Sequence, residues 1–335
     1  KVFSNSDGKI YIMRRIHDVN VTEATQVSRP FQMWQKVSCA NVVKIKDAFI
    51  TRAFNDSSLC VVHEYFPQSS SLYETHFVNF TLTPITQDYL WAYLVQLTNA
   101  LKEVHSQNLS INVLGWDKVI VTGEPGRIKV SDCGVYDILH SLESRDIEEE
   151  QQKDFEELGK LLNGLVTKIA SSKDTSTQDL KVDSDFKIVL DYLLLNDHKK
   201  NVGELASLFT DRILSVVSSL QTHVECTEAY LSRELENGRL FRLMCKLNFI
   251  FGRTESRVDI NWSESGEKFP IILFYDYVFH QVDEAGKSIM DLTHVLRCLN
   301  KLDAGVTEKI MLVTPDEMNC IIISYKELKD LIDST

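Results

Sequence analysis

The segment from Val104 to Leu139 constrains the fold of this chain more than any other. Its residues read in order as the end of an amphipathic helix, a short crossing segment, a hairpin turned by Gly123, Pro125 and Gly126, and then Ser131-Asp132-Cys133-Gly134. Glycine and proline so close together mark a tight turn between two strands. We predict a fold of the mixed α+β class.

This order of elements resembles the one in which protein kinases place their catalytic loop and their metal-binding D-F-G sequence. The consensus sequence of this loop in kinases is H-R-D-L-x-x-x-N, in which the Asp accepts the substrate proton and the Asn binds magnesium. Counted along the chain, the H-R-D positions fall on Ile111, Asn112 and Val113, and the Asn position falls on Lys118. Valine has no lone pair, so phosphoryl transfer by the usual route is blocked.

Two charged residues remain at this predicted site. Asp132 keeps one carboxylate that could face a metal ion or a phosphate. Lys118 puts a cation where a carboxamide would bind a cation, which argues against a second magnesium ion. Its ammonium group could instead lie against a phosphate as a point charge.

The first residues predict a hairpin. Lys1 to Ile16 alternates as two strands around an Asp7-Gly8 turn. The second strand resembles the V-A-I-K strand of kinases, with Arg14 in the place of the lysine that pairs with nucleotide phosphates. The alternative is that Arg14 and Arg15 face solvent from an edge strand. No glycine-rich loop precedes this strand, so the usual backbone clamp over the phosphates is not expected.

The next segments follow the kinase order. Glu23 to Val37 reads as the αC helix, and Ala40 to Phe49 resembles the segment that leads to the next strand. Leu59 to Pro67 looks like a strand and the linker between two lobes, with His63 in the gatekeeper place. Backbone contacts to an adenine tolerate any side chain, so this linker can bind a nucleotide without catalysis. Ser69 to Ser71 follow where ribose contacts are usual, or form a plain loop.

The second lobe is predicted to be helical. Thr83-Pro84 is a helix-start signal, and the helix ends near His105, which we interpret as structural. Leu142 to Gln152 is an acidic run, and its glutamates at 148 to 150 read as a solvated surface. Asp154 to Gly159 follows at once and resembles the start of the kinase αF helix, so the platform for a protein substrate is missing.

Neither Pro nor Gly interrupts Glu204 to Asn237, and apolar residues recur there at steps of three and four. The stripe is Ala206, Phe209, Ile213, Val216, Leu220, His223, Thr227 and Tyr230, widened by Val217, Val224 and Leu231. A seven-residue apolar repeat favours a coiled coil, and the alternative is a long helix packed on its own domain. We therefore predict a protein-kinase-like two-lobed domain (1–203), a coiled-coil linker (204–237) and a small α-rich C-terminal knob (238–335).

The knob is expected to hold helices at about Leu240 to Phe251, Lys268 to His280 and Ser288 to Leu302, two strands, Lys309 to Val313 and Cys320 to Tyr325, and a terminal helix from about Lys326. No catalytic set is found in it. One helix carries more rings than a core face needs: Phe274, Tyr275, Tyr277 and Phe279. We expect these rings to be mostly core, and a remainder that faces out would suit a protein-binding surface.

Composition limits the possible functions. With 36 Lys and Arg against 48 Asp and Glu, the net charge of -12 does not favour a surface that follows a nucleic-acid backbone. Seven single cysteines without a C-x-x-C pair indicate neither a zinc module nor a disulfide framework, and suit a reducing interior. No apolar run is long enough to span a membrane, so the expected location is cytoplasmic.

The whole chain resembles the C-terminal region of the regulatory pseudokinase subunit of the poly(A) nuclease deadenylation complex. The resemblance rests on the order of the three parts and on Tyr11 to His17, Lys44 to Phe49, Glu64 to Pro67, Asp117 to Ile120 and Gly134 to Leu139. It implies a homodimer joined through the coiled coil, with ATP bound but not hydrolysed. It also implies that the knob and coiled coil receive the catalytic nuclease subunit, which shortens poly(A) tails of mRNA.

The residues that the resemblance implies for nucleotide contact are Arg14, Glu64, Tyr65, Phe66, Pro67, Gln68, Ser69, Ser70, Ser71, Asp117 and Lys118. Whether magnesium accompanies ATP stays open, because Asp132-Cys133-Gly134 keeps the kinase carboxylate. The family's poly(A)-binding protein would be reached through parts outside this chain, and contact with mRNA is an expectation of the family only.

Two other functions stay open. An atypical kinase of low activity could use Asp117 or Asp132 as its base. A plain coiled-coil adaptor with an empty cleft would differ from the ATP-binding scaffold only in the pocket. A nucleotide that raises the melting temperature of the protein would exclude this adaptor.

Overall fold

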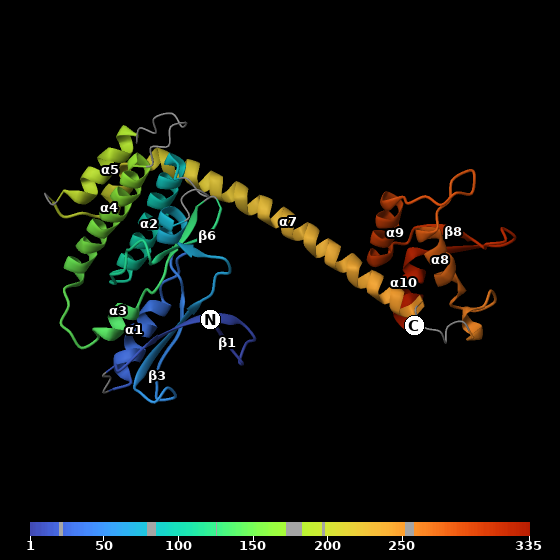
Figure 1. Cartoon of the computed structure of the whole chain (residues 1–335), viewed down its shortest axis with the longest axis horizontal. Helices are drawn as coiled ribbons and strands as arrows, with labels where there is room; N and C mark the ends of the chain where they lie inside the picture. Colours follow the sequence, from blue (N-terminus) through green and yellow to red (C-terminus); the bar gives the residue numbers. More distant parts are fainter. Residues whose placement is uncertain (20–22, 79–84, 125, 172–182, 196–197, 252–257) are drawn as a thin grey trace. The chain divides into compact units, whose positions relative to one another are not determined.

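A four-stranded antiparallel sheet forms the first lobe of the kinase-like domain in the computed structural model (Figure 1). The structure describes all residues except 20–22, 79–84, 125, 172–182, 196–197 and 252–257. The strands, in the order β1-β2-β4-β3, are β1 (Val2–Phe3), β2 (Ile10–Ile16), β4 (Ser58–Glu64) and β3 (Ile45–Thr51). Helix α1 (Thr25–Gln35) packs against β3, so the predicted hairpin and αC helix are confirmed.

The second lobe is mainly helical (Figure 1). Its helices are α2 (Gln87–Ser106), α3 (Val135–Leu139), α4 (Ile147–Ser171), α5 (Ser184–Leu194) and α6 (Val202–Ser207). A small sheet with the order β5-β6-β7 lies beside them, built from β5 (Ser70–Ser71), β6 (Val119–Gly123) and β7 (Arg127–Val130). A short π-helix, η1 (Glu74–Val78), follows β5.

Helix α2 provides the buried centre of this lobe. Its apolar face, which includes Leu94, Leu97, Leu101 and Val104, is completely buried. The start predicted at Thr83-Pro84 lies outside the described residues. The helix begins at Gln87, after Thr86, whose hydroxyl accepts a hydrogen bond from the Tyr89 amide at 3.3 Å. A side-chain cap of this kind satisfies one of the amides that the first turn leaves free.

The long helix differs from its predicted bounds. Instead of one helix over 204–237, α6 ends at Ser207 and α7 runs from Thr210 to Phe251. The interruption coincides with Phe209, which is buried in the core of the kinase-like domain. Gly238 does not end α7, because one glycine costs a helix only about 1 kcal/mol relative to alanine. Contacts divide the chain into two compact units, Lys1–Val224 and Glu225–Thr335.

The predicted apolar stripe of α7 changes its role along the helix. Val216 is buried in the core of the first unit, and Ile213 and Leu220 pack at its edge. Further along, Tyr230 is exposed, as are Leu231 and Leu235. The first part of α7 is therefore packed on its own domain, which was the alternative to a coiled coil. The coiled coil itself stays a prediction.

The second unit has its own core of helices and one hairpin. Its elements after α7 are η3 (Ile260–Trp262), α8 (Phe269–Phe279), α9 (Leu292–Ala304), β8 (Lys309–Val313), β9 (Cys320–Ser324) and α10 (Tyr325–Ser334). The predicted helices and strands are confirmed to within a few residues. The predicted helix from Leu240 to Phe251 is the last part of α7. Of the four rings predicted to exceed a core face, Phe274 is buried, and Tyr275, Tyr277 and Phe279 are partly buried.

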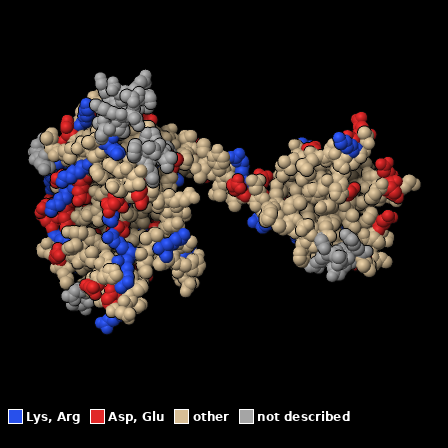
Figure 2. All heavy atoms as spheres, viewed as in Figure 1, with Lys and Arg blue, Asp and Glu red and all other residues tan. Residues whose placement is uncertain are grey.

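The outer face of the β8-β9 hairpin is apolar and exposed. Met311 pairs with Ile322, and both side chains are exposed, whereas the alternate residues Ile310 and Leu312 point into the core. Alternation along a strand places every second side chain on the same face. Figure 2 shows that the viewed face of this second unit carries few charged side chains.

Candidate nucleotide site

Four charged side chains meet where the two lobes join. Arg14 extends from β2, Lys118 immediately precedes β6, and Asp132 follows β7. The Arg14 guanidinium donates to Asp132 Oδ2, and Lys118 Nζ lies 3.3 Å from the same oxygen. Lys118 Nζ also lies 3.0 Å from Asp117 Oδ2. One carboxylate oxygen of Asp132 is therefore shared by two cations. The four side chains together carry two positive and two negative charges, so the group is electrically neutral.

The partner of Arg14 follows from the composition of α1. This helix, TQVSRPFQMWQ, contains no acidic residue. The ion pair that kinases form between their strand lysine and an αC glutamate has no counterpart on this helix. Arg14 turns to Asp132 instead, so it does not point away into solvent as an edge-strand residue would.

The linker between the lobes begins at the end of β4. Glu64 accepts from Lys46 at 2.9 Å, and its backbone amide donates to the Lys44 carbonyl at 3.1 Å. The rings of Tyr65 and Phe66 each carry a lysine ammonium above them, Lys1 at 4.6 Å and Lys129 at 4.8 Å. These cation–π contacts hold the two ring side chains, so the linker is fixed by its own side chains.

Pro67 to Ser71 complete the linker and turn the chain into β5. Gln68 has a φ of 60°, which marks a left-handed turn residue. Ser69 Oγ donates to the Phe66 carbonyl at 2.9 Å, and Ser70 Oγ lies 2.7 Å from Thr75 Oγ1. Ser71 donates to Glu74 from its amide at 2.9 Å. The serine hydroxyls thus stabilise local turns, which favours the plain-loop interpretation over ribose contacts.

The loop with the predicted H-R-D positions is held by a buried carboxylate. Asp154, only 1% exposed, accepts from the amides of Ile111 at 2.8 Å and Asn112 at 2.9 Å. It also accepts from Ser110 at 2.9 Å and lies 2.8 Å from His105 Nε2. These bonds account for the burial of the carboxylate. His105 is therefore structural, as predicted.

A second network ties α3 to α4. Trp34 donates to Asp137, and Arg145 donates to both Asp137 and Glu150. Hydrogen bonds from Arg145 and from Asn112 outweigh the effect of burial and hold the pKa of Glu150 below its usual value. The prediction of a solvated acidic surface is wrong for Glu150, because Arg145 turns inward to pair with it.

His63, the predicted gatekeeper, is buried at 3% exposure. Its Nε2 lies 3.5 Å from the Cys133 carbonyl. Burial lowers the pKa of the imidazole, although the nearby Asp132 carboxylate acts in the opposite direction. The ring is therefore neutral at neutral pH.

The donor set fits an anionic nucleotide. Arg14 and Lys118 are 41% and 28% exposed, so both cations can be reached from solvent. Arginine and lysine are the usual phosphate-binding side chains. Among the described residues, no cluster of three His, Cys, Asp or Glu side chains is placed to hold a metal ion. None of the helices in the described residues has the length and apolar composition that crossing a bilayer requires.

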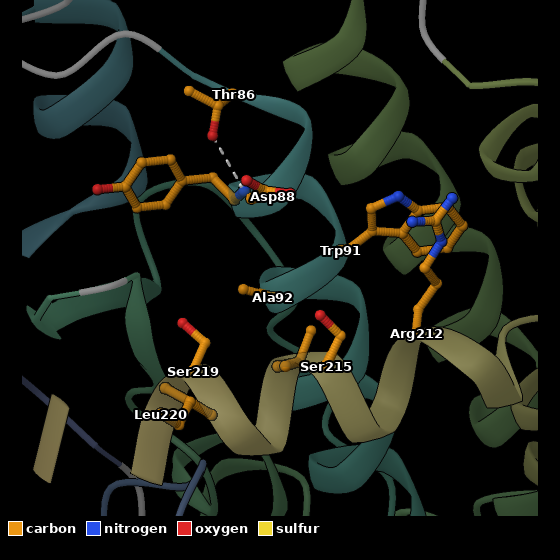
Figure 3. Close-up of a pocket in the computed structure, with 10 residues that line it drawn as sticks. Thr86, Asp88, Trp91, Ala92, Arg212, Ser215, Ser219 and Leu220 are labelled. Atoms are coloured by element: carbon orange, nitrogen blue, oxygen red, sulfur yellow. Dashed lines mark hydrogen bonds between the residues drawn. The ribbon is translucent and has the colours of Figure 1, made fainter. Parts of the chain in front are cut away.

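The first unit has two cavities, and one of them touches the predicted nucleotide-contact residues at Glu64. One, of about 250 Å³, is lined by the end of α1, by Val42 to Ile45 and by Glu64 and Lys129. The other, of about 360 Å³, lies between α2 and α7 (Figure 3). There the Arg212 guanidinium lies over the Trp91 ring at 5.2 Å. None of the predicted nucleotide-contact residues lines this second cavity, and no motif in the sequence pointed to it.

The two lobes, the linker and the charged group between the lobes define a protein-kinase-like fold. Comparison with known proteins places this fold in one family. Residues 202–335 match the family described as the Pan3 C-terminal knob domain. The chain is 67% identical over 335 residues to the "PAN2-PAN3 deadenylation complex subunit PAN3" of Eremothecium gossypii, and 61% identical over 339 residues to the Kluyveromyces lactis protein of that name. It spans about half the length of the curated relatives it matches, 55% and 52% for these two.

Solved structures agree over nearly the full chain. A Neurospora crassa structure, "PAN2 (WD40-CS1) with PAN3 (pseudokinase and C-term)", superposes with a TM-score of 0.77 at 33% identity, covering 99% of this chain and 84% of that one. The Drosophila melanogaster PAN3 pseudokinase gives 0.75 at 32% identity, covering 99% and 89%. The chain belongs to the PAN3 pseudokinase family.

Proposed function

We propose that this chain is the non-catalytic scaffold part of a poly(A) deadenylase, which binds ATP without hydrolysing it and presents the catalytic nuclease subunit to mRNA. The observation that carries the proposal is similarity over the whole chain to PAN3 subunits of PAN2-PAN3 complexes. These relatives are named as subunits of a deadenylation complex, which supports a role in deadenylation. The charged group at the lobe junction supports nucleotide binding by a pseudokinase.

The loss of catalysis is assigned to Val113. The two amides bound by Asp154 belong to Ile111 and Asn112, so the residue that follows them is the one in the base position. An isopropyl group cannot accept a proton. Asp132, the carboxylate that an atypical kinase could use instead, is held by Arg14 and Lys118. This arrangement favours binding over phosphoryl transfer.

Nucleotide binding is assigned to the lobe junction. Arg14, Lys118 and Asp117 form its charged side, and the Glu64 to Ser71 linker forms the side that meets the adenine through its backbone. Magnesium is not needed to explain the donor set, since the two cations can neutralise phosphate charge directly.

Dimerisation is assigned to the outer face of α7. Leu214, Val217, Val224, Leu231 and Leu235 are all exposed, and their spacing of three, four or seven residues puts them along one stripe of the helix. An exposed apolar stripe at this spacing is the pattern of a coiled-coil seam. Two copies of the chain would bury it together.

Nuclease docking is assigned to the knob, and in it to the exposed outer face of the β8-β9 hairpin. Met311 and Ile322 on this face, and Met318 in the turn between the strands, are large apolar side chains that a monomer leaves in water. Contact with mRNA is expected to be local, because Figure 2 shows basic and acidic side chains intermixed on the viewed face of the first unit. Poly(A)-binding protein would be reached through parts outside this chain, in the cytoplasm.

The experiment that tests the proposal combines three measurements on the purified chain. We expect ATP to raise the melting temperature without release of phosphate, light scattering to give a dimer, and a large exonuclease to be recovered from a cytosolic extract. A monomer would overturn the dimer assignment. Transfer of labelled γ-phosphate to a substrate would overturn the scaffold hypothesis and support the atypical kinase.

A further inference from the structure

We propose that Asp132 acts as an internal counter-ion that competes with nucleotide phosphates for Arg14 and Lys118, so that ATP binds by displacing this carboxylate and not by recruiting magnesium to it. The inference rests on the proposed nucleotide site. It assigns to Asp132 the role opposite to that of the metal-binding carboxylate of an active kinase.

The first step of the argument is geometric. Both cations that could receive a phosphate converge on a single oxygen, Asp132 Oδ2, with Lys118 Nζ at 3.3 Å and the Arg14 guanidinium in direct hydrogen bond. A phosphate oxygen that takes either cation must therefore weaken a contact of Asp132. A carboxylate that already has two cations against it also has little to offer a magnesium ion.

The second step is charge. The two cations are matched by the carboxylates of Asp132 and Asp117, and Asp117 lies 3.0 Å from Lys118. The group is thus neutral before a ligand arrives. Adding a polyphosphate brings several negative charges next to Asp132, so its carboxylate repels the ligand while its partners attract it.

The third step is that the backbone that carries Asp132 is fixed, so its carboxylate stays near the two cations after a phosphate displaces it from them. Its backbone has a φ of 59°, a left-handed conformation, and it is followed by Cys133, which is buried, and by Gly134 with a φ of 85°. A Cβ on Gly134 would lie 2.9 Å from the Trp34 ring, so this turn is closely packed against α1. The competition therefore persists in the folded protein.

The test is Asp132→Asn, with affinities for adenosine, AMP, ADP and ATP measured by calorimetry in magnesium and in EDTA. Asparagine tolerates the left-handed backbone of this position and removes only the charge. We expect ATP affinity to rise about threefold to tenfold, a modest gain because both ion pairs are partly exposed. The gain should increase with the number of phosphates and be absent for adenosine.

The matched control is Asp191→Asn, which removes the same charge from an exposed position on α5. Melting curves establish that both variants fold. A gain in Asp132→Asn alone, independent of EDTA, supports the inference. Unchanged or weaker ATP binding in Asp132→Asn, with wild type binding well, overturns it, and a loss seen in magnesium but not in EDTA would assign Asp132 to a metal. If neither protein binds ATP, the proposed nucleotide site itself is wrong.

Discussion

Leu231→Ala tests which face of α7 would join two chains in the proposed dimer. Leu231 is 58% exposed on the stripe that continues Val217 and Val224, and Tyr230 beside it is 63% exposed on the stripe that the kinase-like domain uses at Val216. The two side chains point about 100° apart on the helix. They have nearly equal exposure, so each is the control for the other.

The expected magnitude follows from the area left in water. Full burial of a leucine side chain is worth about 2 kcal/mol, so a side chain that is 58% exposed has roughly 1 kcal/mol still to gain. A symmetric dimer contains two copies of Leu231, which gives about 2 kcal/mol per dimer. Since 1.4 kcal/mol is a factor of ten, the dimer dissociation constant should rise about thirtyfold.

Sedimentation equilibrium over a range of concentrations measures this constant. Alanine has a higher helix propensity than leucine, so the variant should keep its helix content by circular dichroism. Tyr230→Ala should leave dimerisation nearly unchanged. If Tyr230→Ala dissociates the dimer and Leu231→Ala does not, the outer-stripe argument is refuted, and the seam follows the stripe originally predicted from the sequence.

Three further predictions concern stability and docking. Arg145→Met should destabilise the first unit by about 3–5 kcal/mol, since Asp137 and Glu150 lose a largely buried partner, and adding Glu150→Gln should recover part of the lost melting temperature. The fold lowers the pKa of His63, so its imidazole binds a proton more readily in the unfolded chain. The free energy of unfolding should therefore fall as the pH drops below about 6.5. In urea titrations at several pH values, His63→Phe should reduce this dependence of stability on pH. Ile322→Asp should lower recovery of the nuclease at least tenfold, whereas Val282→Asp, at a similarly exposed apolar site of the knob, should not; equal losses would reject the hairpin face.

Local patterns predicted most of the secondary structure. The Asp7-Gly8 turn, the strand over Lys309–Val313 and the helix at αC depend on neighbours within a few residues, and the structure has them close to the expected bounds. The break between α6 and α7 could not be predicted in this way. It depends on the burial of Phe209 against a helix more than a hundred residues earlier in the chain.

Partners of charged residues were the least predictable feature of the site. Resemblance to the kinase motifs gave Arg14, Lys118 and Asp132 as separate candidates, but not that both cations share one oxygen. Arg145 carried no signal, because an arginine in an acidic run reads as surface. Only the folded position of Glu150 at the start of α4 reveals that the pair faces inward.

Asp154 explains how catalysis can be lost while the loop keeps its shape. A buried carboxylate is tolerated only where donors surround it, and here the donors are the amides of Ile111 and Asn112 together with the side chains of Ser110 and His105. Main-chain amides are supplied by any residue type. The loop is therefore held by bonds that do not depend on the side chain at position 113, so a valine at the proposed base position would remove the chemistry without removing a support of the fold.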